Sequence, residues 1–181
     1  MTFDNEQLSL FQINKNELPL SERLRPNSLD DFIGQEKAVG KGTLLRKMIE
    51  VKNLSSFILW GPPGVGKTTL AKIISKINDL YFQSFSAVLS GIKEVKIIME
   101  EAKEKLKITG KKTIIFIDEI HRFNKAQQDA FLSYVEEGTI ILIGATTENP
   151  SFSIISPLLS RMRVITLKKL ENDEIIILLN K

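Results

Sequence analysis

Three glycines, a lysine and a threonine lie within residues 61–68, where the sequence reads Gly-Pro-Pro-Gly-Val-Gly-Lys-Thr. Glycines at this spacing let backbone N–H groups converge on phosphate oxygens at the start of a helix. The ammonium group of Lys67 would approach the β- and γ-phosphates, and the hydroxyl of Thr68 would bind Mg²⁺. The pattern predicts a loop that binds ATP together with Mg²⁺, rather than a chance glycine turn with an exposed lysine. The residues expected to contact the nucleotide are Gly61, Pro62, Pro63, Gly64, Val65, Gly66, Lys67, Thr68 and Thr69.

Two adjacent carboxylates follow an apolar segment later in the chain, where Ile114–Ile117 leads directly into Asp118 and Glu119. Ligands of open α/β sheets bind at the carboxyl ends of the strands, so a strand here would deliver both carboxylates to a binding edge. Asp118 would organise Mg²⁺ through its water shell, and Glu119 would orient and polarise an attacking water. Taken alone, the pair fits a solvated strand end equally well. Because the pair follows a phosphate-binding loop in the same chain, it indicates a site that hydrolyses the bound nucleotide.

A third polar segment, Gly144–Asn149, follows another apolar run. A side chain in this segment would sit between the γ-phosphate and Glu119, and Thr147 is the residue that we expect there. Turn formation explains the same segment as well, because Thr, Asn and the following Pro150 favour turns. His121 is the only histidine of the chain. The sequence leaves open whether it completes a turn or lies near the γ-phosphate.

Short apolar runs rich in β-branched residues alternate with amphipathic helical patterns, which predicts an α/β fold with a parallel β-sheet flanked by helices. Strands are expected at residues 57–60, 81–85, 113–117, 139–145 and 163–167. Helices are expected directly after the phosphate-binding loop, over residues 95–106, from residue 126 to a stop near Gly138, and over residues 171–179. Asn124 and Gln127 have the spacing of a capping box for the third of these helices. The acidic pair should lie at the tip of the strand that neighbours the phosphate-binding loop.

The composition is that of an ordinary globular domain. The chain has 181 residues, of which 43% are hydrophobic and 26% are charged. No apolar stretch approaches the roughly 20 residues that a membrane-spanning helix needs, and the N-terminus lacks the features of a secretory signal, so we expect a cytoplasmic protein. The absence of cysteine excludes disulfides and thiolate metal sites. A net charge of +3 is compatible with nucleic acid as a partner, although solvated surface lysines explain it equally well.

The polar segments together resemble a known family. Residues 61–69, 118–119, 144–149 and 158–161 are similar to the AAA+ module of clamp-loader-type ATPases. More narrowly, residues 58–64, 118–125 and 144–152 resemble the bacterial replication-associated recombination protein A family, whose eukaryotic relative is the Werner-interacting ATPase. The resemblance runs from about Leu20 to the C-terminus and implies a P-loop NTPase fold with an AAA+ core. It also implies an ATPase that acts on DNA at stalled replication forks.

The resemblance also assigns roles to individual residues, one of which, Arg161, no local pattern singles out. Arg161 matches the arginine finger that reaches the ATP of a neighbouring subunit, and Thr147 matches the sensor residue beside the γ-phosphate. Residues 24–35 match a box beside the adenine, with Ile33 as its apolar contact. A structural turn explains any single side chain of that box equally well.

The chain divides into three expected parts. Residues 1–19 are polar and lack sustained periodicity, which is typical of a flexible N-terminal arm. Residues 20–168 are expected to form the AAA+ core. Members of the family continue into a helical lid and an oligomerisation region, so residues 169–181 would be only the start of a lid that is essentially missing. With those regions present, the resemblance implies a homo-oligomer, a tetramer.

Two further contacts are expected with partners. Within the arm, residues 7–11 resemble the short peptide by which bacterial replication proteins bind the β sliding clamp, through Gln7, Leu8, Leu10 and Phe11. The alternative is that these apolar side chains pack on the protein's own surface. DNA contact is a hypothesis for Lys93 and Lys96, because lysines at the start of a helix favour phosphate groups. A solvated lysine face is the more common arrangement.

The sequence therefore predicts a DNA-dependent ATPase that serves replication-fork maintenance, recombination and repair. A clamp-loader subunit or a Holliday-junction branch-migration motor shares every catalytic residue, so only the family-specific strings separate these alternatives. A third alternative is a clamp-tethered adaptor that binds ATP without turnover. The presence of both Glu119 and Arg161 argues against it, since a pure switch needs neither.

Overall fold

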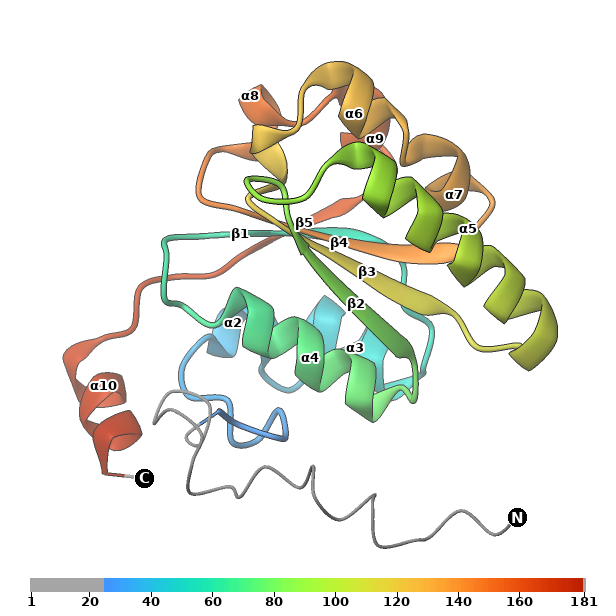
Figure 1. Cartoon of the computed structure of the whole chain (residues 1–181). Helices are drawn as coiled ribbons and strands as arrows, with labels where there is room; N and C mark the ends of the chain where they lie inside the picture. The colour runs from blue at the N-terminus through green and yellow to red at the C-terminus, as the bar shows by residue number, and fades with distance from the viewer. Residues whose placement is uncertain (1–24, 181) are drawn as a thin grey trace, which may run out of the picture.

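The computed structural model describes residues 25–180, which form three layers with a sheet between two groups of helices (Figure 1). The five strands are all parallel, which confirms the predicted fold class. The expected N-terminal arm, with Gln7, Leu8, Leu10 and Phe11, lies outside the described residues. Within residues 25–180, no helix is long and apolar enough to cross a membrane.

The strands are β1 (Phe57–Trp60), β2 (Tyr81–Ser86), β3 (Thr113–Asp118), β4 (Ile140–Thr146) and β5 (Arg163–Thr166). One face of the sheet is covered by α2 (Glu36–Val39), α3 (Leu44–Glu50) and α4 (Lys67–Ile77). The other face is covered by α5 (Ile92–Thr109), α6 (Lys125–Asp129), α7 (Leu132–Glu136) and α9 (Ser156–Leu159). The 3-10 turn η3 (Ile120–Arg122), α8 (Pro150–Ser153) and α10 (Asn172–Leu179) complete the described residues.

The order of strands in the sheet is β2-β3-β4-β1-β5. The phosphate-binding loop follows β1 and the acidic pair lies at the carboxyl end of β3, so β4 lies between them. The expectation that the acidic pair ends the strand next to the loop is therefore wrong by one strand. The intervening strand β4 ends at Thr146, which brings Thr147 to the space between the loop and the acidic pair.

Both faces of the sheet are buried, which explains the continuously apolar strands. On β3, Ile114 and Phe116 join the core that contains the buried side chains of α4, whereas Ile115 and Ile117 join the core that contains those of α5. Close packing explains why residue 144 of β4 is a glycine. A Cβ on Gly144 would lie 2.8 Å from the side chain of Ile58 and 2.9 Å from that of Ile120. The sheet is thus a rigid platform whose carboxyl edge holds the predicted site residues.

The helix expected over residues 126–138 is divided into α6 and α7. The predicted capping box is confirmed: the Asn124 side chain accepts from Gln127 N at 2.9 Å, and the Gln127 side chain accepts from Asn124 N at 2.8 Å. The division falls where Phe131 is fully buried and its N–H donates to Gln128 O at 3.1 Å. That is the tighter i→i+3 spacing of a 3-10 turn. The helix is therefore interrupted by a tighter turn at the buried Phe131.

Candidate nucleotide-binding and hydrolysis site

Helix α4 begins directly after the glycine-rich loop. Its N-cap, Gly66, has a left-handed backbone with φ 93°, which glycine adopts without strain, and no side chain caps the helix. The N–H groups of the first turn are therefore left for another acceptor, and the helix dipole makes this end positive. A Cβ at Gly66 would lie 2.9 Å from the ring of Phe32, so the loop rests against a buried aromatic side chain.

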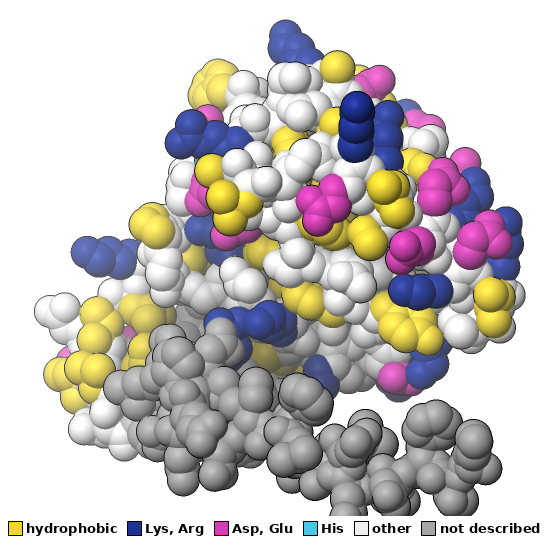
Figure 2. Space-filling view, in the orientation of Figure 1, with side chains coloured by type: hydrophobic (Ala, Val, Ile, Leu, Met, Phe, Trp, Pro, Cys, Tyr) yellow, Lys and Arg dark blue, Asp and Glu magenta, His cyan; other side chains and the backbone are white. Residues whose placement is uncertain are grey.

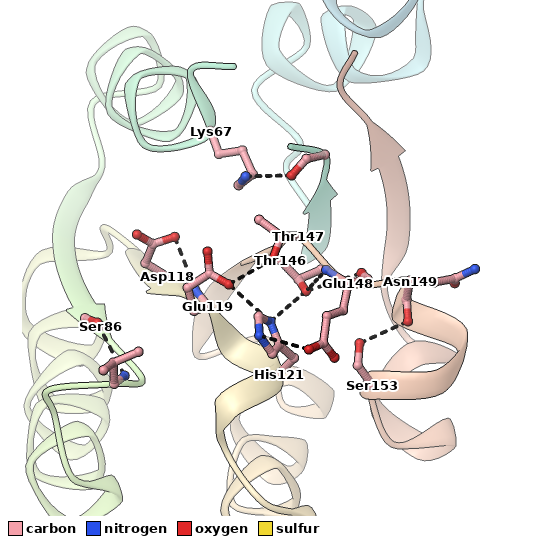
Figure 3. A network of polar contacts seen from close by, with 12 residues as sticks. Lys67, Ser86, Asp118, Glu119, His121, Thr146, Thr147, Glu148, Asn149 and Ser153 are labelled. Carbon is pink, nitrogen blue, oxygen red and sulfur yellow. Dashed lines mark hydrogen bonds and ion pairs between the residues drawn. The ribbon is translucent and has the colours of Figure 1, made fainter. Parts of the chain in front are cut away.

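Lys67 is buried at the start of α4, and its Nζ donates to the carbonyl oxygens of Gly61 at 2.8 Å and Pro62 at 2.9 Å. Burial lowers the pKa of the Lys67 ammonium group, while the negative charges of Glu119 and Asp118 act in the opposite direction. Figure 3 shows Lys67 across from these two carboxylates. The loop carbonyls thus hold the ammonium group opposite the acidic pair.

Two adjoining hollows lie along the loop. The first is polar and includes Gly64, Lys67, Thr68, Thr69, Asp118 and Glu119 in its lining. The second is mainly apolar and includes Pro26, Ile33, Val65, Leu170, Leu178 and Leu179. Because Arg25, Gly64, Gly66 and Thr69 line both, the two form one depression with a polar end and an apolar end. Their volumes of about 410 and 310 Å³ are in the range of small-molecule sites.

The acidic pair occupies the carboxyl end of β3 and the turn after it. Burial raises the pKa of the Asp118 carboxyl, and the charge of Glu119 raises it further. Glu119 has a left-handed backbone with φ 52°, a conformation that costs a non-glycine residue about 1–3 kcal/mol. Its N–H donates to Asp118 Oδ1 at 3.2 Å. Such local strain is typical of functional sites, and here it turns the chain so that both carboxylates lie on the side of Lys67 (Figure 3).

Thr147 and His121 both contact the Glu119 carboxylate (Figure 3). Thr147 Oγ1 donates to Glu119 Oε2 at 3.3 Å. His121 Nδ1 lies 3.3 Å from the same oxygen and 2.9 Å from Thr146 Oγ1. On the opposite side of the ring, His121 Nε2 lies 3.5 Å from a carboxylate oxygen of Glu148. The structure thus brings Thr147 to Glu119, as the sequence predicted, and adds a histidine contact that the sequence did not predict.

Arg161 lies outside both hollows of its own chain. Its Nε forms an ion pair with Glu136 at 2.6 Å, and its Nη1 donates to Pro157 O at 2.7 Å. The side chain is 42% exposed. Arg161 is therefore separate from the residues that line its own depression, and it is accessible from outside the chain.

The residues of the polar hollow fit ATP with Mg²⁺. Within residues 25–180, no group of three or more His, Cys, Asp or Glu side chains could hold a metal ion by itself. Proteins usually bind Mg²⁺ through one or two carboxylates together with substrate phosphates and water. Thr68 and Asp118 line the same hollow as the uncapped start of α4, so their oxygen atoms suit a Mg²⁺ that arrives with a triphosphate.

The C-terminal wall of the apolar hollow was missed by the sequence reasoning. Leu170, Leu178 and Leu179 line it, although α10 was expected only as the start of a lid. The wall is attached through Gln35, whose side chain donates to Lys168 O at 2.6 Å and accepts from Lys168 N at 2.9 Å. The signal available in the sequence was the run of five apolar residues at 175–179, which is longer than the stripe of a two-turn surface helix.

Comparison with known proteins defines the family. Residues 57–170 match the model of the ATPase family associated with various cellular activities (AAA). The chain therefore belongs to the AAA family of ATPases.

The resemblance to the replication-associated recombination protein A family is confirmed at the level of sequence. The chain is 52% identical over 157 residues to the replication-associated recombination protein A of Haemophilus influenzae, covering 87% of this chain and 35% of that protein. It is 50% identical over 161 residues to the ATPase WRNIP1 of Dictyostelium discoideum, covering 89% of this chain and 18% of that protein. The chain thus spans about a third or less of the length of these relatives.

A solved structure agrees in fold. The Thermotoga maritima RuvB Holliday junction branch migration motor superposes with a TM-score of 0.68 at 34% identity. The superposition covers 87% of this chain and 53% of that one. The AAA+ core predicted from the sequence is therefore confirmed as a fold.

Proposed function

We propose that the chain forms the catalytic core of a Mg²⁺-dependent ATPase that hydrolyses ATP to ADP and phosphate. The observation that supports this most directly is that the uncapped start of α4 shares one polar hollow with Asp118 and Glu119. A triphosphate along the loop would accept hydrogen bonds from backbone N–H groups and from Lys67. The adjoining apolar hollow, with Ile33 in its lining, would take the adenine ring.

In this proposal, residues of the polar hollow and the neighbouring Thr147 each have one task. Glu119 orients and polarises the attacking water, because it lines the same hollow as Lys67 and its carboxylate lies across from the ammonium group. Thr147 holds that carboxylate through its hydroxyl. Thr68 and Asp118 bind Mg²⁺, which when present neutralises charge on the transferred phosphoryl group.

We place Arg161 in the active site of a neighbouring subunit. Its position outside its own hollows and its exposed side chain support this, because a finger must reach across an interface. Activity would then require a homo-oligomer, for which we propose a tetramer in the intact protein. Arginine fingers in other P-loop enzymes contribute about 10³–10⁵ in rate, so an isolated subunit would hydrolyse ATP slowly.

For the biological setting, we propose replication-associated recombination and fork maintenance in the cytoplasm. The 52% identity to a relative of that name supports this setting. The similarity to a RuvB branch migration motor makes a DNA motor of that kind the second candidate. On sequence alone, we also retain the docking of Gln7, Leu8, Leu10 and Phe11 on a β sliding clamp.

DNA contact is proposed at the start of α5, where Lys93 and Lys96 are exposed. Farther along this helix, lysines pair with glutamates, as in Lys105–Glu101 and Lys107–Glu104. Figure 2 shows acidic and basic side chains interspersed on the face that carries α5, with hydrophobic groups between them. The surface therefore favours a local phosphate contact at the start of the helix over a continuous basic track.

The test is steady-state phosphate release by the intact protein, including any region beyond residue 181. We expect single-stranded or gapped DNA to raise kcat. Changing Lys93 and Lys96 to Ala should weaken DNA binding and reduce its salt slope by about 1 for each DNA phosphate that the lysines no longer neutralise. Lys107→Ala, at the far end of the same helix, is the matched control.

Equal rates with and without DNA would refute DNA dependence. Tight ATP binding with no phosphate release under any condition would favour the non-hydrolysing adaptor.

A further inference from the structure

The side chain of His121 is 4% exposed and lies between two carboxylates at the edge of the proposed active site (Figure 3). Its place is fixed by its neighbour Ile120, which is fully buried and packs over Gly144 of β4. With no Cβ at Gly144, η3 can lie directly on the strand. The packing therefore sets the imidazole ring beside Thr146, at the end of β4.

The turn that carries His121 does not depend on the imidazole ring. Its backbone is closed by Arg122 N donating to Glu119 O at 2.8 Å and by Phe123 N donating to Ile120 O at 3.1 Å. The ring instead makes its polar contacts with side chains on both sides, toward Glu119 and toward Glu148. Closing the turn therefore does not explain why the ring contacts these two carboxylates.

Within the described residues, both polar contacts to the Glu119 carboxylate are made with a single oxygen. Thr147 Oγ1 and His121 Nδ1 each lie 3.3 Å from Oε2. The Thr147 hydroxyl holds Oε2 and the imidazole ring lies against the same oxygen, so together they limit the rotation of the carboxylate and leave Oε1 as the oxygen available to accept a proton from water. A base that is already oriented needs no rearrangement when the reaction begins.

We infer that His121 is a positioning residue for Glu119, and that Glu148 orients the ring from its other side. The inference rests on the proposed role of Glu119 in ATP hydrolysis. The imidazole ring lies between the two carboxylates, with Nδ1 toward Glu119 and Nε2 toward Glu148. Thr146 completes the arrangement, because its Oγ1 lies 2.9 Å from His121 Nδ1 and accepts from Glu148 N at 3.0 Å.

Glu148 is the outer end of this arrangement. Its side chain is 58% exposed, whereas that of Glu119 is 30% exposed. The contact between Glu148 and the ring is therefore partly screened by water, and removing it should cost less than removing the ring. The expected order of effects is His121→Ala larger than Glu148→Gln.

The experiment compares single-turnover ATP hydrolysis and ATP affinity in the intact protein for wild type, His121→Ala, His121→Asn and Glu148→Gln. We expect His121→Ala to lower the hydrolysis rate about tenfold or more, as removal of a supporting side chain often does, with ATP affinity unchanged. His121→Asn, which keeps a donor near the position of Nδ1, should recover part of the rate. Glu148→Gln should show a smaller decrease.

A double-mutant cycle with Glu119→Gln tests whether His121 acts through Glu119. If it does, His121→Ala causes no further decrease in the Glu119→Gln background, because the residue that it positions is already disabled. An equal fold-decrease in both backgrounds, or a wild-type rate in His121→Ala, overturns the inference. If His121→Ala does not fold, the same cycle with His121→Asn gives the answer.

A different result is expected if the proposed role of Glu119 in ATP hydrolysis is itself wrong. If Glu119→Gln alone hydrolyses ATP at the wild-type rate, the proposed role of Glu119 is wrong, whatever His121 does. If Glu119→Gln is inactive and the His121 variants are not impaired, only the positioning role is wrong.

Discussion

Thr147 Oγ1 donates to Glu119 Oε2 across 3.3 Å and so joins the carboxyl ends of β4 and β3. β4 is the strand between the phosphate-binding loop and the acidic pair. A side chain that directly follows β4 can therefore contact the proposed base at the end of β3.

Thr147→Val keeps the size and branching of the side chain but removes the hydroxyl. A hydrogen bond to a charged group contributes about 1.5–3 kcal/mol, which corresponds to a decrease in kcat of about tenfold or more if the bond acts in the transition state. Thr147→Ser, which keeps the hydroxyl, is the control and should retain most of the activity. Equal kcat values for the Val and Ser variants would contradict a role for this hydroxyl.

Gly66→Ala and Gly64→Ala form a matched pair, because both glycines have positive φ but only one is crowded. Gly66 has φ +93° and its added Cβ would lie 2.9 Å from the Phe32 ring, whereas Gly64 has φ +78° and nothing within 4 Å. Both changes should cost about 1–2 kcal/mol for the left-handed backbone. Gly66→Ala should cost about 1–3 kcal/mol more for overpacking. Urea denaturation gives both values.

The double variant Gly66→Ala with Phe32→Leu tests the reason for the difference. If crowding is responsible, the smaller Leu side chain should reduce the extra cost of the alanine. A cost for Gly66→Ala no greater than that for Gly64→Ala would show that the loop does not rest firmly on Phe32.

The candidate-site residues that local sequence patterns could predict were those of the loop and the acidic pair. Lys67 and Asp118 belong to strings in which glycine spacing or an apolar run is itself the signal, so neighbouring residues were sufficient. The order of strands could not be read in the same way, because it depends on pairing between distant segments, as for Phe57 with both Ile143 and Arg163. That is why the position of β4 between the loop and the acidic pair was missed.

Other features depend on contacts that leave no periodic signal. The helices α2, α8 and α9 have four residues each, too few for a helical repeat to appear. The contact of His121 with Glu119 depends on Ile120 packing over Gly144, a residue 24 positions later in the chain. Sequence reasoning therefore left His121 without a role.

Tyr134 offers a test of the side-chain contacts at α5, because its hydroxyl donates to Glu100. This hydrogen bond raises the pKa of Tyr134 to about 12. Because the pKa is raised in the folded state, the bond stabilises the fold fully when the pH is below the ordinary tyrosine pKa of about 10. This stability is lost as the pH rises through about 12. Absorbance at high pH should show a late tyrosinate step that Tyr134→Phe removes.

Glu100→Gln is the control for this titration. Without the carboxylate, the midpoint of the Tyr134 step should move down toward the ordinary value. At neutral pH, Tyr134→Phe should destabilise the protein by at most about 1 kcal/mol, since the pair is exposed to solvent. A late step that is unchanged in Glu100→Gln would mean that the hydrogen bond is absent in solution.

Arg161 is expected to complete the site of a neighbouring subunit. Arg161→Ala should lower the kcat of the assembled protein by about 10³-fold or more. Mixing Arg161→Ala subunits with Glu119→Gln subunits should restore part of the activity, because some interfaces then combine an intact Glu119 with an intact Arg161. If the mixture is no more active than its components, the finger does not act between subunits.

The central claim is that the loop around Lys67 and the carboxylate of Glu119 belong to one hydrolytic site. The most direct measurement compares phosphate release and ATP affinity for wild type and Glu119→Gln in the intact protein. Removal of a general base costs about 10²–10⁴-fold in rate, so we expect turnover to fall by at least that lower factor while ATP still binds. Turnover that survives the change, or ATP binding that disappears together with turnover, would contradict the account.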